Sequence, residues 1–161
     1  MKVAIYAGSF DPLTLGHLDI IKRSLNIVDK LIIGVGENVR KKYLFTVQER
    51  INMINLSLKD HSNQNFEIKA FNGLLVDFAN TENASFIVRG IRGVTDFDYE
   101  FQMGMANQDL NSNIETLFLL PKRDYIFISS STVKEISYFK KDISKYVPVP
   151  VLEAFNKKFN E

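Results

Sequence analysis

A segment near the N-terminus combines residues that can bind a phosphate and stabilise charge on it. Residues 8–17 read Gly-Ser-Phe-Asp-Pro-Leu-Thr-Leu-Gly-His. His17 lies at the expected start of a helix, where N–H groups and the positive end of the helix dipole favour an anion. Gly8 and Gly16 let the backbone approach a ligand closely. A histidine at such a place is more often only a local cap, but the whole string favours phosphate chemistry.

A second candidate site follows a strand in the middle of the chain. Residues 89–92 read Arg-Gly-Ile-Arg and place two guanidinium groups where that expected strand ends. Guanidinium groups bind phosphate oxygens in a bidentate manner and keep their charge at any useful pH. An isolated Arg-Gly-x-Arg is more often a turn with surface arginines. Here the acidic and aromatic segment 96–100, Asp-Phe-Asp-Tyr-Glu, follows at the start of the next expected helix.

Two further segments could contact the same ligand. Serines 129–131 precede an expected helix, and an N-cap accounts for one of them, whereas three in a row can hold a polyphosphate. The basic run 40–42 follows the second expected strand; such a run is usually a solvated surface, but here a lysine can reach over the ligand. The second histidine, His61, stands among polar residues and is predicted to be a solvated loop residue.

These candidates must be positioned by a regular alternation of strands and helices. Apolar and β-branched runs predict strands at 2–7, 30–36, 66–71, 85–88 and 116–120. Helical spacing and capping signals predict helices at 18–28, 46–58, 74–81, 97–110, 133–139 and 151–159. The pattern predicts a single α/β domain over residues 1–161, an open Rossmann-like five-stranded parallel sheet with helices on both faces. Ligands of such sheets bind outside the carboxyl ends of the strands, where all four candidates fall.

Composition narrows the class of protein. A chain of 161 residues with 45% apolar residues can form one sizeable domain. Its formal net charge of +1 gives no basis for predicting a nucleic-acid or membrane partner. The absence of cysteine excludes disulfides, thiolate nucleophiles and cysteine-type zinc sites. No signal sequence or membrane-spanning run is apparent, so we expect a soluble, cytoplasmic protein.

Taken together, the motifs resemble those of a known family. Thr14 to His17 match the (H/T)xGH signature of the nucleotidylyltransferase superfamily, and residues 128–134 resemble its ISSSxxR/K element. Residues 8–17 form neither a Walker A loop nor a Gly-x-Gly-x-x-Gly motif. The combination with RGIR and DFDYE resembles phosphopantetheine adenylyltransferases, bacterial enzymes of coenzyme A synthesis. The resemblance covers essentially the full chain.

The resemblance implies transfer of the adenylyl group of ATP to 4′-phosphopantetheine, giving dephospho-coenzyme A and pyrophosphate. His17 would stabilise the transition state at the α-phosphate, and Lys41 and Arg92 would also act in catalysis. The implied ATP-binding residues are Ser9, Phe10, His17, Gly90, Ile91, Arg92, Glu100, Tyr125, Ile126, Phe127, Ile128, Ser129, Ser130 and Ser131. The implied residues for phosphopantetheine are Ser9, Lys41, Leu74, Leu75 and Arg89.

The same resemblance implies Mg²⁺ bound with ATP, held by phosphates and water because the sequence shows no acidic cage. It also implies a homohexamer and binding of coenzyme A as an inhibitor. Alternatives remain open at this stage. A related enzyme could act on nicotinate mononucleotide or a polyol phosphate, and the same fold could serve a non-catalytic nucleotide-binding module. An aminoacyl-tRNA synthetase fragment is disfavoured because no anticodon-binding domain or basic surface is apparent.

Overall fold

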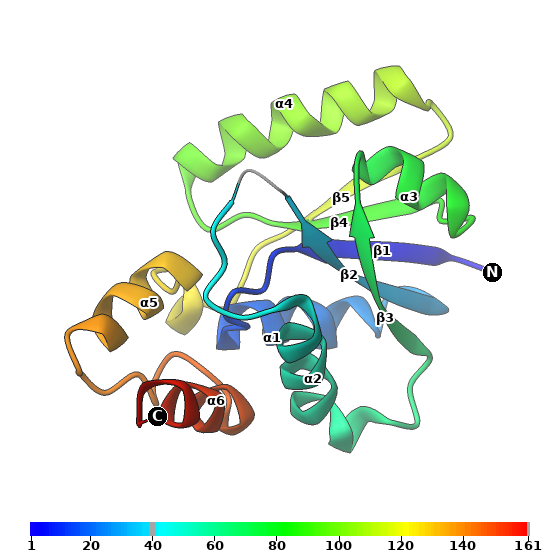
Figure 1. Ribbon diagram of the computed structural model, residues 1–161. Helices are drawn as coiled ribbons and strands as arrows, with labels where there is room; N and C mark the ends of the chain where they lie inside the picture. The colour runs from blue at the N-terminus through cyan, green and yellow to red at the C-terminus, as the bar shows by residue number, and fades with distance from the viewer. Residues whose placement is uncertain (39–40, 161) are drawn as a thin grey trace.

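Five parallel strands form the centre of the molecule. The computed structural model describes residues 1–38 and 41–160, and Figure 1 shows the sheet between two layers of helices. The strands are β1 (Val3–Gly8), β2 (Lys30–Glu37), β3 (Phe66–Asn72), β4 (Phe86–Gly90) and β5 (Glu115–Leu119). Their order across the sheet is β3-β2-β1-β4-β5, and every neighbouring pair is parallel. The predicted α/β fold class is thereby confirmed.

The strand order locates the place where a ligand is expected. From β1 the chain adds β2 and β3 on one side and then returns to add β4 and β5 on the other. The direction of winding therefore reverses between β1 and β4. Loops leaving the carboxyl ends of two such strands diverge to opposite faces and open a crevice between them. The segments 8–17 and 89–92 follow these two strands.

Helices cover both faces of the sheet (Figure 1). They are α1 (Leu15–Ser24), α2 (Val47–Ser57), α3 (Leu75–Thr81), α4 (Val94–Leu110), α5 (Ser130–Tyr138) and α6 (Val149–Asn160). Short 3₁₀ turns occupy Lys59–His61 and Arg123–Tyr125. Helices α3 and α4 lie on one face, and α1, α2, α5 and α6 gather on the other. Within the described ranges no helix has both the length and the apolar character needed to cross a membrane.

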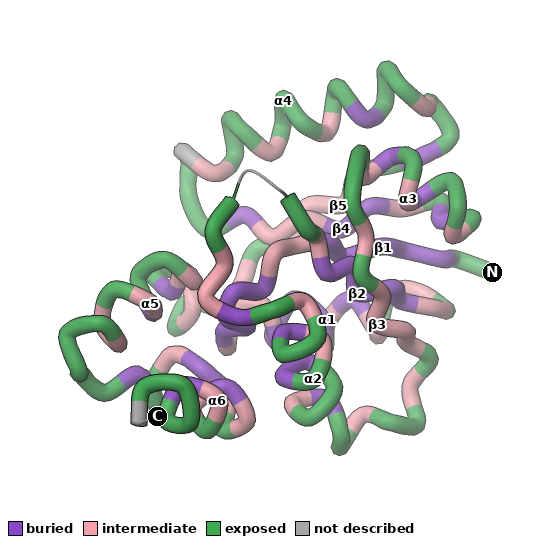
Figure 2. Tube along the Cα trace, viewed as in Figure 1, coloured by how far each residue is buried: buried purple, intermediate pink, exposed green. Residues whose placement is uncertain are grey.

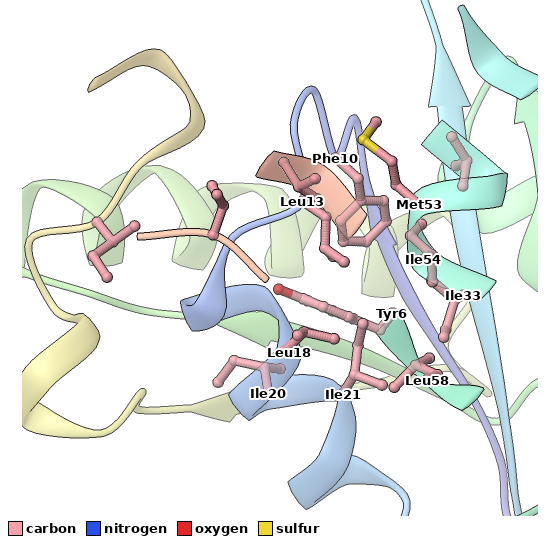
Figure 3. Packing of buried hydrophobic residues seen from close by; sticks show 14 of the residues in the cluster. Tyr6, Phe10, Leu13, Leu18, Ile20, Ile21, Ile33, Met53, Ile54 and Leu58 are labelled. Atoms are coloured by element: carbon pink, nitrogen blue, oxygen red, sulfur yellow. The ribbon is translucent and has the colours of Figure 1, made fainter. Parts of the chain in front are cut away.

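The alternation of side chains along β1 supplies two separate cores. Ala4 and Tyr6 belong to the larger core, which contains side chains of α1, α2, α5 and α6. Ile5 and its neighbours on the opposite side of the strand pack with residues of α3 in the smaller core. A strand buried on both faces reads as a continuous apolar run, as this one does. Figure 2 shows the resulting buried band through the sheet, and Figure 3 shows the larger core around Tyr6.

Helix α1 begins earlier and ends earlier than the predicted range of 18–28. Thr14 caps it, because the Thr14 hydroxyl accepts the N–H of His17 at 3.3 Å. At the other end, the N–H groups of Asn26 and Ile27 bond to carbonyls three residues back, which tightens the chain into a turn. The predicted boundaries were therefore wrong at both ends. His17 lies inside the first helical turn, where its side chain can fold back on the cap.

Two other helices also begin three residues before their predicted starts. Helix α5 starts at Ser130, because the Ser129 hydroxyl accepts the N–H of Thr132 at 3.0 Å and caps the helix. Helix α4 starts at Val94 after Gly93. In both cases a polar or glycine-rich segment taken for loop forms the first helical turn. The consequence is functional, since the first turns of α4 and α5 carry side chains toward the crevice.

Candidate active site

A pocket of about 440 Å³ lies at the carboxyl ends of β1 and β4. It is built by the loop between β1 and α1, the segment from the end of β4 into α4, the segment from the end of β5 to the start of α5, and the loop that follows β2. Its lining residues are Tyr6, Ala7, Gly8, Ser9, Thr14, Gly16, His17, Ile20, Lys41, Arg89, Gly90, Arg92, Asp96, Tyr99, Glu100, Pro121, Tyr125, Ile128, Ser129, Ser130 and Ser131. Four segments far apart in the sequence thus meet at the topological switch point.

The tautomer of His17 is fixed by the helix cap. The N–H of Thr14 donates to Nδ1 of His17 at 3.1 Å, while the Thr14 hydroxyl lies 3.1 Å from the same nitrogen. Together with the bond from the His17 N–H to Thr14, these contacts form a capping box in which histidine takes the place usually held by Glu or Gln. A backbone N–H is always a donor, so Nδ1 must be unprotonated. The proton of the neutral ring therefore resides on Nε2.

The surroundings keep the His17 ring neutral. Burial, and after it the positive charges of Arg92 and Arg89, lower the pKa of His17 to about 4. The ring of Phe10 packs against the imidazole edge-to-face, with centroids 5.2 Å apart, and against Tyr6 at 5.5 Å. At neutral pH His17 is thus an uncharged hydrogen-bond donor in the pocket. It resembles a positioned electrophile more than a base.

The side chain of Phe10 packs into the core and supports the loop between β1 and α1. Its backbone is in the left-handed region at a φ of 47°, and its side chain is only 1% exposed. A bulky residue in that region is strained and persists where packing determines its position. Figure 3 shows Phe10 and Leu13 among core side chains that include Met53. The predicted ATP-binding Phe10 therefore does not line the pocket with its ring; the ring holds the loop and the imidazole above it.

Arg89 reaches the pocket but is engaged by two partners. Its Nε and Nη2 donate to the two carboxylate oxygens of Glu100, each at 2.6 Å, and its Nη1 donates to the carbonyl of Ala7 at 2.9 Å. The Glu100 carboxylate raises the pKa of Arg89 against the opposing effect of burial. Strand β4 is thereby linked to the end of β1 and to α4. A phosphate that binds Arg89 must share it with Glu100.

Arg92 is arranged similarly, but its side chain is more exposed to solvent than that of Arg89. Its Nε donates to Asp96 at 2.9 Å, and its Nη1 donates to the carbonyl of Ile128 at 3.1 Å. Asp96 and Glu100 are four residues apart on α4, so each carboxylate meets one arginine of the 89–92 segment. The bond to Ile128 connects this wall with the serines that follow. The predicted phosphate ligands Arg92 and Ser129 to Ser131 are therefore brought together.

The serine run has divided roles. The Ser129 hydroxyl caps α5, which confirms the alternative interpretation for one serine. Ser130 donates through its hydroxyl to the carbonyl of Pro12 at 2.8 Å and so ties α5 to the loop after β1. All three serines nevertheless line the pocket with the first turn of α5. The helix N-terminus adds a favourable field for an anion at this place.

The residues described by the structure contain no group of three or more His, Asp and Glu side chains that could hold a metal ion. The two carboxylates that line the pocket, Asp96 and Glu100, are both paired with arginines. A metal cage made by the protein does not fit this donor set. A divalent ion entering the pocket would have to be carried by the phosphates of its ligand.

Comparison with known proteins places the chain in a family. Residues 5–136 match the cytidylyltransferase-like family model, and this range contains all four pocket-forming segments. The chain is 49% identical to a phosphopantetheine adenylyltransferase of Caldanaerobacter subterraneus over 161 residues, covering all of this chain and 99% of that protein. It is 47% identical to the enzyme of the same name from Lachnoclostridium phytofermentans, covering 99% and 97%. The chain belongs to the phosphopantetheine adenylyltransferase family.

A solved structure agrees on the fold. A putative nicotinate-nucleotide adenylyltransferase from Vibrio parahaemolyticus superposes with a TM-score of 0.68 over 98% of this chain and 94% of that one. Its sequence identity is 18%, so the likeness concerns the fold alone. The resemblance inferred from TxGH, RGIR and DFDYE is confirmed by the full-length relatives.

Most residues predicted for the site line the pocket of this family member. Those that do are Ser9, His17, Lys41, Arg89, Gly90, Arg92, Glu100, Tyr125, Ile128, Ser129, Ser130 and Ser131. Those that do not are Phe10, Leu74, Leu75, Ile91, Ile126 and Phe127. Leu75 packs against the smaller core, Ile91 is buried, and Phe127 is 89% exposed. Arg40, in the predicted basic run, lies outside the described residues.

Two buried charged residues that hold the loops in place were not predicted from the sequence. Asp11 is 2% exposed and Arg50 is 1% exposed, although both are charged. Arg50 donates through Nη1 to the carbonyls of Ser9 at 2.7 Å and Gly36 at 3.0 Å, and its guanidinium stacks on the ring of Tyr43. The position of Arg50 in a helical pattern gave it the appearance of an ordinary polar residue. Asp11 lay within the recognised motif, but only the structure shows its partners.

Proposed function

We propose that this family member transfers the adenylyl group of ATP to the 4′-phosphate of phosphopantetheine, forming dephospho-coenzyme A and releasing pyrophosphate. The observation that carries the proposal is the state of His17 in the pocket. Its Nδ1 is occupied by the helix cap, so Nε2 offers a proton from an uncharged ring. A group of this kind stabilises charge that develops on a phosphate without having to remove a proton. The names of the full-length relatives supply the substrates.

The chemistry requires no strong base. An oxygen of the 4′-phosphate is already ionised at neutral pH and attacks the α-phosphorus of ATP. A new bond forms between that oxygen and the α-phosphorus, and the bond from the α-phosphorus to the oxygen bridging to the β-phosphorus breaks. The electron pair leaves with pyrophosphate, so no proton has to be transferred. Catalysis then consists of positioning and of neutralising charge on the phosphoryl oxygens.

The lining residues divide this work between two anions. His17 would donate to an oxygen of the α-phosphate. Arg92 and the serines at the start of α5 would hold the β- and γ-phosphates, since guanidinium groups and helix N-termini both favour phosphate. Lys41, Arg89 and the Ser9 hydroxyl would hold the phosphate of phosphopantetheine. Glu100 and the main chain of residues 125–128 would face the ribose and adenine.

Three accompanying properties form part of the proposal. ATP would enter as its magnesium complex, with the ion held by phosphate oxygens and water. The chain would assemble as a homohexamer, an idea supported by apolar side chains left exposed along α4, among them Phe97, Phe101 and Met105. The protein would act in the cytoplasm, which suits a chain without cysteine. Sedimentation or light scattering of the purified protein tests the hexamer directly.

The function is tested by pyrophosphate release from ATP with 4′-phosphopantetheine, run beside nicotinate mononucleotide and glycerol 3-phosphate. We expect turnover with phosphopantetheine and none with the other acceptors. Turnover with another acceptor would preserve the mechanism and reject the substrate. Measurable ATP binding without pyrophosphate release from any acceptor would reject the enzymatic proposal in favour of a nucleotide-binding module.

A further inference from the structure

Asp11 lies at the junction of three pocket-forming segments. Its Oδ1 accepts the N–H of Phe45 at 2.9 Å, and its Oδ2 accepts the N–H of Leu44 at 3.0 Å. The same Oδ2 forms an ion pair with Nζ of Lys134 at 2.9 Å. Leu44 and Phe45 belong to the loop after β2, and Lys134 to α5. A single carboxylate in the loop after β1 therefore holds the two segments that face it.

Burial of the Asp11 carboxylate costs free energy unless its charge and its lone pairs all have partners. Asp11 is 2% exposed, and a carboxylate at such depth needs its charge and its lone pairs satisfied. Two backbone N–H groups and one ammonium supply what the carboxylate needs. Removing the ammonium leaves the charge on two neutral donors, so the loop N–H groups and Lys134 depend on each other through Asp11. The Lys134 side chain is one third exposed, so it is the accessible end of the buried link.

The loop held by Asp11 is the one that carries Lys41. Only two residues separate Lys41 from Leu44, and the Lys41 N–H donates to the carbonyl of Asn38 at 2.9 Å. At the other end, Lys134 follows Ser130 by one helical turn, and Ser130 itself donates to the carbonyl of Pro12. Lys41 thus lies three residues from an amide that Asp11 holds.

We propose that Asp11 and Lys134 are positioning residues that act through the loop carrying Lys41, so that the pair sets the affinity and alignment of the phosphopantetheine phosphate. This inference rests on the proposed function, because it takes Lys41 as a ligand of that phosphate. Neither residue of the pair lines the pocket. Their effect is therefore indirect, and it must disappear when Lys41 no longer acts.

The test is a double-mutant cycle on kinetics. Asp11→Asn and Lys134→Met are each combined with Lys41→Ala, and kcat and KM are measured for both substrates. In the wild-type background we expect each to lower kcat/KM for phosphopantetheine by about tenfold to a hundredfold, since a displacement of about 1 Å costs that much. Lys134→Arg should retain most of the activity. In the Lys41→Ala background both substitutions should have little further effect.

The matched control is Lys69→Met. It also breaks lysine–carboxylate pairs, those of Lys69 with Glu82 at 2.6 Å and with Glu67 at 2.9 Å, and none of these residues lines the pocket. Its kinetic constants should equal those of the wild type. Losses of equal size in both Lys41 backgrounds, or a lower melting temperature with unchanged kinetic constants, would show that the pair only supports the fold. Should Asp11→Asn fail to fold, Lys134→Met decides by the same criteria.

A second readout does not need turnover. Hydrogen exchange at the amides of Leu44 and Phe45 should accelerate in Asp11→Asn and Lys134→Met and stay slow in Lys69→Met. Unchanged exchange would overturn the proposal even if activity fell. An inactive wild type would speak against the proposed function alone, whereas an active wild type with an additive cycle would speak only against the role of Asp11 and Lys134.

Discussion

The two sides of the pocket use charged and polar groups in different ways. On the β1 side, the groups contact the main chain: Nδ1 of His17 accepts from Thr14, Asp11 accepts two loop N–H groups, and Arg50 donates to two carbonyls. On the β4 side, charged side chains pair with one another, Arg89 with Glu100 and Arg92 with Asp96, and each arginine also donates to one main-chain carbonyl. The first side is largely buried, and the second is partly open to solvent.

The difference separates groups that hold the reacting centre in place from groups that bind the ligand. A buried group bonded to the backbone loses its partner only when the fold rearranges, so it holds the reacting centre in one place. The Arg92–Asp96 pair is the more exposed of the two, and an ion pair of that kind contributes little to stability, while Arg89 can bind a phosphate beside Glu100. We therefore expect substitutions on the β1 side to change kcat or stability, and those on the β4 side to change KM.

The largest effect is expected at His17. Removal of one donor aimed at developing charge typically lowers kcat by about a hundredfold to a thousandfold, and His17→Ala should do so with a modest change in KM. His17→Gln is the sharper variant, because Gln is an ordinary capping-box residue and can keep the bond to Thr14 while losing the imidazole. Steady-state kinetics and melting temperature should show a stable, inactive enzyme. A loss below tenfold would reject the assigned role.

The next effect is expected at Arg89. Arg89→Ala removes a charge-assisted donor worth about 1.5–3 kcal/mol, which corresponds to a rise of about tenfold to a hundredfold in the dissociation constant of phosphopantetheine. Titration calorimetry measures it. Glu100→Gln is the informative companion, since it releases Arg89 from its carboxylate. Phosphopantetheine should then bind no more weakly than to the wild type. Unchanged affinity in Arg89→Ala would show that the guanidinium serves only Glu100 and Ala7.

A substitution of Arg50 tests the comparison of the two sides through its effect on the melting temperature. Arg50→Met removes the donor to the carbonyls of Ser9 and Gly36, and each unsatisfied group costs about 1–3 kcal/mol. For a chain of this size the melting temperature should fall by about 2–4 °C for each kcal/mol. Arg92→Ala, the control on the β4 side, should melt within about 2 °C of the wild type. A rise in melting temperature for Arg50→Met would mean that desolvation of its charge, including the unpartnered Nε, outweighs its bonds.

Local patterns were enough to predict the sheet and most of the pocket. Buried parallel strands are continuous apolar runs, which makes them recognisable in the sequence. Parallel strands bring their carboxyl ends to one edge of the sheet, so the sequence alone was enough to place Arg89 and His17 together. The start of α1 was misplaced because the capping residue at its N3 position is a histidine, which helix-start rules do not include. The buried charged residues were not predicted because their contacts are with distant segments.

Arg50 illustrates those contacts, whereas the role of Leu74 on the pantetheine arm stays a prediction. Leu74 precedes α3 and is 56% exposed. Arg50 is in a helix whose sequence suits a solvated arginine, and only the approach of Ser9 and Gly36 buries it. Such partners lie 41 and 14 residues away in the sequence. A single sequence carries no local signal for them.

The smallest expected effect concerns the protonation of His17, and it joins the two sides. With a pKa of about 4, the ring should stay neutral from pH 8 to about 5, whereas an ordinary histidine titrates near 6.5. The ring Cε1–H signal in NMR spectra, assigned with His61→Gln, should not shift over that range. Titration near pH 6.5 would contradict the expected state.

The same pKa predicts the sign of a stability effect. The unfolded chain binds a proton near pH 6.5, and the folded chain does not until about pH 4. The contribution of the neutral His17 ring to the free energy of unfolding is therefore complete above pH 6.5 and is lost as the pH falls toward 4. The melting temperature should fall over this range for this reason, and His17→Gln should lack that part of the fall. Arg92→Ala should raise the pKa of His17, because the charge of Arg92 is the largest cause after burial. Such a rise would show that Arg92, on the β4 side, helps to keep the ring of His17, on the β1 side, neutral.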